Sequence, residues 1–180
     1  MSNITQSRRF AIALTALSAL GRLVPHAPNF TPLGASCLFA GSRISGWLAY
    51  LLPLAVMVAT DPFVGGFTRS SPLIYMSFMI SVWIGRRFAR RPTAARVGVA
   101  AFACSLQFFL ISNFAVWFSG VLSGSSFYSH DLAGLITCYT AALPFWGRTL
   151  AGDLLFSAAL FGAWSLVPRL ARTGARTAHA

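Results

Sequence analysis

The chain contains no lysine and no glutamate, and its only acidic residues are Asp61, Asp131 and Asp153. Charged residues make up 9% of its 180 residues, whereas soluble domains usually carry about 25%. So few charges could hardly build a water-facing surface around a domain of this length. The scarcity therefore argues against a soluble globular protein.

Chemical motifs are also scarce. No hydrolase elbow, phosphate-binding loop or zinc-protease motif is present, so no catalytic residue, cofactor or metal is predicted and the chain is not expected to be an enzyme. The three cysteines fall inside apolar segments without metal-ligand spacing and are expected to be packing residues. They are Cys37, Cys104 and Cys138.

The positive charge has an uneven distribution. All 14 basic residues are arginines, and the net charge is +11. They lie mainly between or beside apolar runs, which is how basic residues orient a membrane protein. This distribution argues against a nucleic-acid partner, for which a basic face or stripe is expected.

Apolar residues make up 56% of the chain and fall into seven segments. The segments are residues 10–24, 32–42, 44–60, 72–88, 96–119, 132–145 and 149–167. A helix that crosses a bilayer needs about 20 residues, so the second and sixth segments are short for a crossing. The first segment follows Arg8 and Arg9 as in a signal peptide, but without a convincing cleavage site it is expected to be a retained helix.

The arginines order these segments. Five of them lie in one short loop, and others flank both ends of the chain, so all three regions are expected in the cytoplasm. The five are Arg86, Arg87, Arg90, Arg91 and Arg96. Two cytoplasmic termini require an even number of crossings. We therefore expect an all-α protein of the inner (cytoplasmic) membrane, with six transmembrane helices, a re-entrant or interfacial segment at 132–145, and tails at about 1–9 and 169–180 of one domain, 1–180.

This topology places the loops 25–31, 61–71 and 120–131 on the outer face. Polar side chains in these loops and in the adjoining segments predict a binding pocket that opens outward. The predicted pocket residues are His26, Asn29, Gln107, Asn113, Tyr128, Tyr139 and Asp153.

Structural roles remain open for several of these residues. Asp153 could form a local salt bridge with Arg148 at the start of a helix. Gln107 and Asn113 could join helices by hydrogen bonds. The tyrosines could be anchors at the membrane interface.

The first helix carries a stripe of small residues, Ala11, Thr15 and Ala19. Such a stripe permits close contact between helices. The contact could be internal packing, or it could be docking to a partner membrane protein.

The stretch 25–35, PHAPNFTPLGA, is the most distinctive part of the sequence. Together with SLQFF at 105–109, Asn113 and Trp117, and the stretch from Gly134 to Phe145, it resembles a family of uncharacterised bacterial membrane proteins. In size and six-helix layout the chain is also similar to the S components of energy-coupling factor transporters. This resemblance implies capture of a vitamin-like molecule from outside, and work with a transmembrane coupling protein and paired ATPases. It also implies that Ala11, Thr15 and Ala19 dock the coupling protein.

The sequence thus predicts a substrate-binding membrane subunit for uptake of a small nutrient. The alternative is a structural or accessory membrane protein without transport, and an intramembrane enzyme comes third. The expected partners are a small-molecule substrate, membrane lipid and the coupling protein with its ATPase subunits. The N-terminal histidine metal site of cobalt and nickel S components is missing here, since the chain starts Met1-Ser2-Asn3.

Overall fold

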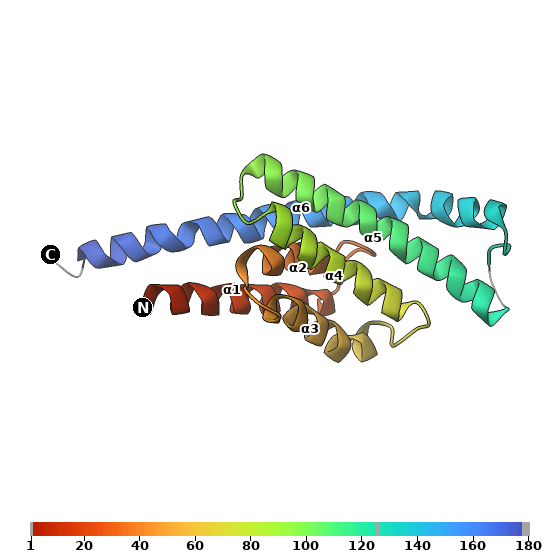
Figure 1. Cartoon of the computed structure of the whole chain (residues 1–180), viewed down its shortest axis with the longest axis horizontal. Helices are drawn as coiled ribbons and strands as arrows, with labels where there is room; N and C mark the ends of the chain where they lie inside the picture. The colour runs from red at the N-terminus through yellow and green to blue at the C-terminus, as the bar shows by residue number, and fades with distance from the viewer. Residues whose placement is uncertain (1, 125–126, 178–180) are drawn as a thin grey trace.

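The computed structural model describes residues 2–124 and 127–177, with side chains described for 7–124 and 127–166. This part of the chain is all helical apart from its connections, with no strand. The helices are α1 (Ser2–Leu20), a short 3₁₀ helix η1 (Gly21–Leu23), α2 (Leu33–Arg43), α3 (Leu48–Val64), α4 (Ser71–Phe88), α5 (Ala94–Ser123) and α6 (Leu132–Thr177). They form an elongated bundle in which both ends of the chain lie at the same end of the molecule (Figure 1).

Helix α2 is the centre of the bundle. It contacts each of the other five α-helices, and every residue from Leu33 to Ser42 is buried. Eleven residues rise only about 16 Å, so this helix alone is too short for a bilayer core of about 30 Å. Small side chains bring its neighbours close, and the Ser36 hydroxyl donates to the Ser18 hydroxyl of α1 at 2.8 Å.

The closest contact in the bundle is between α2 and α4. A Cβ added at Gly41 would lie 1.9 Å from the carbonyl oxygen of Val82, and one added at Gly85 would lie 2.0 Å from that of Leu38. Each glycine therefore faces the backbone of the opposite helix. The two backbones can touch only because both positions lack a side chain.

Local signals in the sequence account for the helix ends. The Thr93 side chain accepts the Arg96 N–H at the start of α5, and Gly124 ends that helix in the left-handed conformation at φ 68°. At the start of α6, the Asp131 carboxylate accepts the Gly134 N–H at 2.8 Å. The Ser129 hydroxyl and this N–H lower the pKa of Asp131, which therefore stays ionised at neutral pH.

The predicted re-entrant segment is wrong. Residues 132–145 and 149–167, expected as two segments, belong to the single helix α6. Pro144 and Gly147 lie inside it, and Gly147 has open space around its Cβ position. Proline and glycine are tolerated within membrane helices, so these residues do not end the helix.

Among the described residues, two helices are long and apolar enough to cross a membrane: α5, and α6 over Leu132–Leu166. Helix α3 is apolar but shorter. The stretches predicted as tails are helical where the structure describes them, since α1 begins at Ser2 and α6 continues to Thr177. Met1 and residues 178–180 lie outside the described residues.

Candidate binding site

Two adjoining cavities lie between the α1–α2 loop and helices α4, α5 and α6. The larger has a volume of about 260 Å³ and the smaller about 40 Å³. Asn29, Phe108 and Thr149 line both, so the two spaces share a wall. Asn29 has a φ of 63° and is the one non-glycine residue at positive φ in the described part of the chain. Asparagine tolerates this conformation, which brings the loop to the cavities.

Aromatic rings shape the larger cavity. The rings of Phe109 and Trp146 stack with centroids 5.3 Å apart, and Phe108 and Phe145 complete the aromatic wall. Ser112 and Asn113 add polar groups, and the Asn113 amide donates to the Phe109 carbonyl at 2.8 Å. Apolar walls with a few polar groups are the usual make-up of a small-molecule site.

The smaller cavity contains the buried carboxylate of Asp153, which is 3% exposed. The Ala35 N–H in the first turn of α2 donates to this carboxylate, and a Cβ at Gly34 would lie 2.2 Å from its Oδ1 atom. Asp153 therefore supplies an acceptor to the N-terminus of a helix that has no side-chain cap of its own. The salt bridge to Arg148 considered above does not form, because Arg148 is exposed and the only ion pair between described residues is elsewhere.

Two polar atoms of residues that line the cavities have no partner. Trp146 Nε1, from the larger cavity, and Thr31 Oγ1, from the smaller one, are buried without a hydrogen bond to any described residue. A buried polar group without a partner costs about 1–3 kcal/mol. Water or a ligand in the adjoining space can supply the missing bonds.

Of the seven predicted pocket residues, the structure brings three together around these cavities: Asn29, Asn113 and Asp153. Gln107 lies beside them, where its amide donates to the Ser77 carbonyl and the Ser81 hydroxyl, both at 2.9 Å. Gln107 therefore joins α5 to α4 by hydrogen bonds, which is the structural role that the sequence left open for it.

The other three predicted residues do not line the cavities. The Tyr139 hydroxyl donates to the Leu110 carbonyl at 2.6 Å, and its ring packs edge-on against Phe109. His26 is exposed and its Nδ1 atom contacts the Val24 carbonyl. Tyr128 is half-buried in the segment before α6. Thr149, Ser112 and Trp146 were missed, although Thr149 precedes Asp153 by four residues and so shares its helix face.

The stripe on α1 faces inward. Ala11, Thr15 and Ala19 are each 0% exposed, and the Thr15 hydroxyl donates to the Ala11 carbonyl. These three side chains pack inside the bundle, where α1 contacts α2 and α3. The stripe predicted for partner docking is therefore not a surface of the folded chain. The apolar face that α1 exposes carries Phe10, Leu17 and Leu20 instead.

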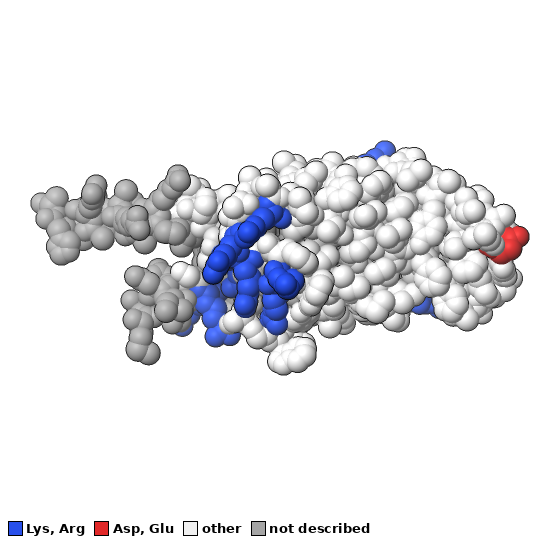
Figure 2. Space-filling view, turned by 45° about the horizontal axis from the view of Figure 1, so that its top comes forward, with Lys and Arg blue, Asp and Glu red and all other residues white. Residues whose placement is uncertain are grey.

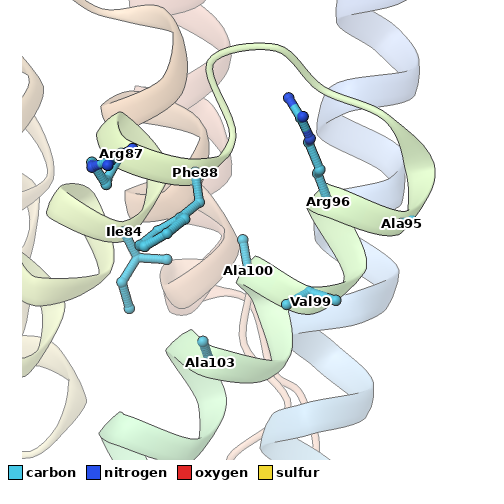
Figure 3. Close-up of a pocket in the computed structure, with 8 residues that line it drawn as sticks. All are labelled: Ile84, Arg87, Phe88, Ala95, Arg96, Val99, Ala100 and Ala103. Atoms are coloured by element: carbon cyan, nitrogen blue, oxygen red, sulfur yellow. The ribbon is translucent and has the colours of Figure 1, made fainter.

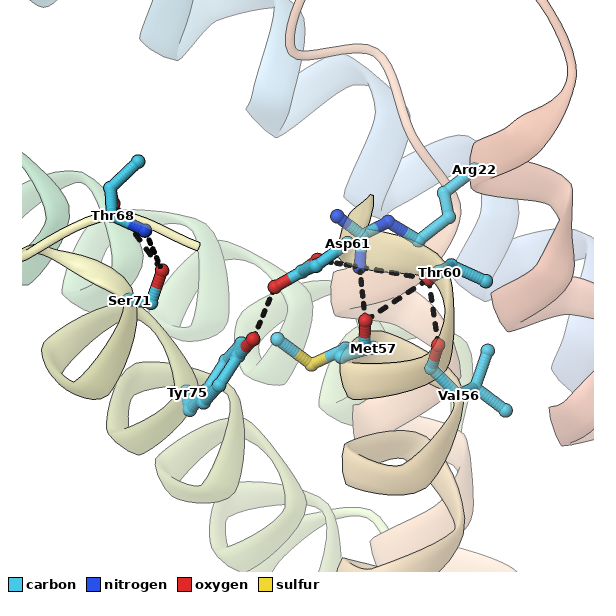
Figure 4. Close-up of polar contacts among 8 residues, drawn as sticks. All are labelled: Arg22, Val56, Met57, Thr60, Asp61, Thr68, Ser71 and Tyr75. Atoms are coloured by element: carbon cyan, nitrogen blue, oxygen red, sulfur yellow. Dashed lines mark hydrogen bonds and ion pairs between the residues drawn. The ribbon is translucent and has the colours of Figure 1, made fainter. Parts of the chain in front are cut away.

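A polar cluster not predicted from the sequence joins α3 and α4 to the 3₁₀ helix η1 (Figure 4). Arg22 forms an ion pair with Asp61 at 2.8 Å, and the Tyr75 hydroxyl donates to the other carboxylate oxygen. Arg22 also donates to the Thr60 hydroxyl at 3.2 Å. A cavity of about 200 Å³ adjoins the cluster. Because the two charges are paired and the Tyr75 and Thr60 hydroxyls are hydrogen-bonded, we interpret the cluster as a structural link between three elements.

Metal-ligating side chains do not gather in the described part of the chain. No group of three or more His, Cys, Asp or Glu residues is placed there to hold a metal ion. The three cysteines are free thiols and are buried.

The described part of the chain is an all-helical bundle with two helices long and apolar enough to cross a membrane and with two adjoining cavities. The chain belongs to a family of unknown function, DUF6580, whose model matches residues 3–175. No curated protein and no solved structure matches it.

Proposed function

We propose that the chain crosses the membrane six times, with both termini in the cytoplasm, and that the short α2 makes one crossing together with the α1–α2 loop that precedes it. The five arginines at 86–96 gather at the end of the molecule where both ends of the chain lie, whereas the acidic surface visible in Figure 2 is at the opposite end. We call the end of the molecule that carries these five arginines the arginine end. Large apolar side chains are exposed along every helix except the buried α2, including Leu17, Trp83 and Val99. Lipid contact explains such a surface, and the arginines orient it.

We further propose that the protein is a substrate-binding subunit for uptake of a small nutrient. The observation that carries this proposal is the pair of adjoining cavities, which contain a buried carboxylate and two unpaired polar atoms. The α1–α2 loop that lines them connects helix ends remote from the arginine end, so the site belongs to the outer half of the bundle. Irregular backbone beside a cavity, next to a short buried helix, is typical of transporter binding sites.

The walls favour a small ligand with a flat ring. Phe108, Phe109 and Trp146 offer ring faces, and Asn113 and Thr149 offer hydrogen bonds at the edge. The proposed role is binding without catalysis. A coupling protein with ATPase subunits would supply the energy for transport, as the resemblance to S components implies, and it would have to contact a surface other than the buried stripe of α1.

The test is mass spectrometry of metabolites that co-purify with the full chain in mild detergent. The wild-type protein should carry a stoichiometric small molecule. Asn113→Ala should weaken its binding by about 1–3 kcal/mol, the usual cost of an unmatched buried polar group. The variant should still insert and fold, which size-exclusion chromatography would show.

Helix α6 offers a matched control. Thr149 lines both cavities, whereas Thr137 is exposed, and the hydroxyl of each donates to the carbonyl four residues earlier. Thr149→Val should lower metabolite occupancy and Thr137→Val should not. An equal loss of metabolite occupancy in the two variants would contradict the proposed binding site. A stable protein partner without any metabolite would favour the structural or accessory function instead.

Cysteine labelling tests the six crossings in a background without the three native cysteines. Phe67→Cys, between α3 and α4, and Phe127→Cys, before α6, should react with an impermeant reagent added outside. Pro92→Cys, between α4 and α5, should react only after the membrane is opened. Labelling of position 92 from outside would contradict the topology.

A further inference from the structure

A groove lies at the arginine end, between the end of α4 and the start of α5 (Figure 3). It has a volume of about 560 Å³. Ile84 and Phe88 of α4 form one side, and Val99 and Ala103 of α5 form the other. Arg87 and Arg96 lie toward the loop end of the groove, one on each helix. The groove thus combines an apolar floor with two cations at one end.

These two cations have no acidic partner within the protein. The chain has three acidic residues in all, and none is close to Arg87 or Arg96. Asp61 pairs with Arg22, Asp131 lies at the start of α6 at the far end of the bundle, and Asp153 is buried against α2. Both guanidinium groups belong to exposed residues. Arg87 lies over the Phe88 ring and Arg96 donates to the Arg91 carbonyl, so both cations remain available to an external anion.

The order of groups along the groove defines the chemistry of its occupant. Val99 is 70% exposed and Phe88 is 53% exposed, so the apolar walls are open to an external molecule. An occupant needs a negative group at the loop end and a hydrocarbon portion that extends from it along α5. Free phosphate would leave the apolar part of the groove unfilled, and a zwitterionic lipid would bring its own cation close to the arginines.

We infer that the α4–α5 groove binds an anionic phospholipid, with the phosphate between Arg87 and Arg96 and an acyl chain against Ile84, Phe88, Val99 and Ala103. The lipid comes from the leaflet at the arginine end. Basic pockets between membrane helices bind anionic headgroups through this combination of charge and hydrocarbon contact.

Native mass spectrometry of the full chain in micelles tests this inference. The probes are dioleoyl phosphatidylglycerol and dioleoyl phosphatidylcholine, which share acyl chains and differ in headgroup charge. The wild-type chain should retain phosphatidylglycerol in preference to phosphatidylcholine. Arg87→Ala/Arg96→Ala should lower binding of phosphatidylglycerol by about 25-fold, because it removes two charge-assisted contacts with the phosphate.

The neighbouring loop supplies the control. Arg90→Ala/Arg91→Ala removes the same charge from exposed positions outside the groove, and should reduce binding less than about threefold. Equal losses in the two double variants would mean diffuse attraction to surface charge and would overturn the site. Equal retention of both lipids by the wild-type chain would also overturn it.

A second variant keeps both arginines and fills the groove. Val99→Trp should displace the acyl chain and lower retention of phosphatidylglycerol, while the exposed position leaves the bundle intact. Unchanged retention in this variant would show that the lipid does not lie in the groove. Size-exclusion profiles and melting temperatures identify any variant that fails to fold, and Arg87→Gln/Arg96→Gln then takes the place of the alanine pair.

Discussion

The α2–α4 and α5–α6 contacts belong to the same bundle but are built from opposite kinds of residue. Gly41 and Gly85 let the backbones of α2 and α4 touch. Between α5 and α6, Phe109 and Trp146 stack, and a cavity of about 260 Å³ lies beside them. Small residues close a helix interface, whereas large rings hold helices apart and leave space that a ligand can use.

The strongest way to break this comparison is to separate α2 from α4. In Gly41→Ala or Gly85→Ala the new methyl would meet a backbone oxygen, which cannot rotate away. We expect a loss of stability of about 3 kcal/mol, at the upper end for overpacking, because backbone must move. The measurement is the melting temperature in detergent. Gly98→Ala and Gly162→Ala are the controls, since open space surrounds both positions, and they should be neutral or stabilising by about 0.5–1 kcal/mol.

The second prediction concerns the Arg22–Asp61 ion pair. This pair stabilises the bundle by electrostatic attraction, whereas the α2–α4 interface stabilises it by close packing of two backbones. Asp61→Asn should cost about 2–3 kcal/mol, less than a fully buried pair, because the two side chains keep 15% and 10% exposure. Arg22→Met/Asp61→Asn should recover part of the loss, since no unpaired cation remains. A double variant as unstable as the sum of the single variants would show that the two charges are not coupled.

The third prediction concerns Asp153, which contacts the first turn of α2 and lines the smaller cavity. Asp153→Ala removes the acceptor for the Ala35 N–H and should destabilise the fold by about 1–3 kcal/mol. Asp153→Asn keeps an acceptor oxygen and should cost less than about 1 kcal/mol. Thermal unfolding of the two variants side by side distinguishes the cases. Equal stability of the alanine variant and the wild type would contradict the capping role.

The smallest expected effect is at the outer part of the α5–α6 pair. Tyr139→Phe removes one hydrogen bond, to the Leu110 carbonyl, and keeps the ring against Phe109. We expect a loss of about 0.5–1 kcal/mol, with metabolite binding unchanged because the residue does not line the cavities. Weaker metabolite binding in this variant would show that Tyr139 belongs to the binding site after all.

Sequence patterns predicted the helical class and located most helices, because long apolar runs and arginine clusters are local features. They predicted a break near Trp146 and Arg148, but α6 continues through it. Neighbouring helices can satisfy the backbone groups that a proline or glycine leaves without a hydrogen bond, so such residues do not have to end a helix. The burial of α2 on all sides could not be predicted. Its residues are small and apolar, but a sequence does not show how many neighbours a short helix has.

The site was predictable only in part, for a similar reason. Asn29, Asn113 and Asp153 stood out as polar residues in apolar surroundings, and the structure brings them to adjoining cavities. Gln107 stood out equally, yet it bonds to Ser77 and Ser81. Whether a buried amide has a partner depends on the facing helix, which no spacing along one chain reveals.

The contact between Gly34 and Asp153 has a consequence for how the family can vary. A methyl group at position 34 would overlap the carboxylate, so position 34 cannot take a side chain while Asp153 stays in place. Relatives with alanine or serine at position 34 should carry a smaller side chain than aspartate at position 153. Relatives that keep the acid should keep the glycine. The two positions, 119 residues apart, should therefore be linked in one direction, because a lineage that loses the glycine should also lose the acid.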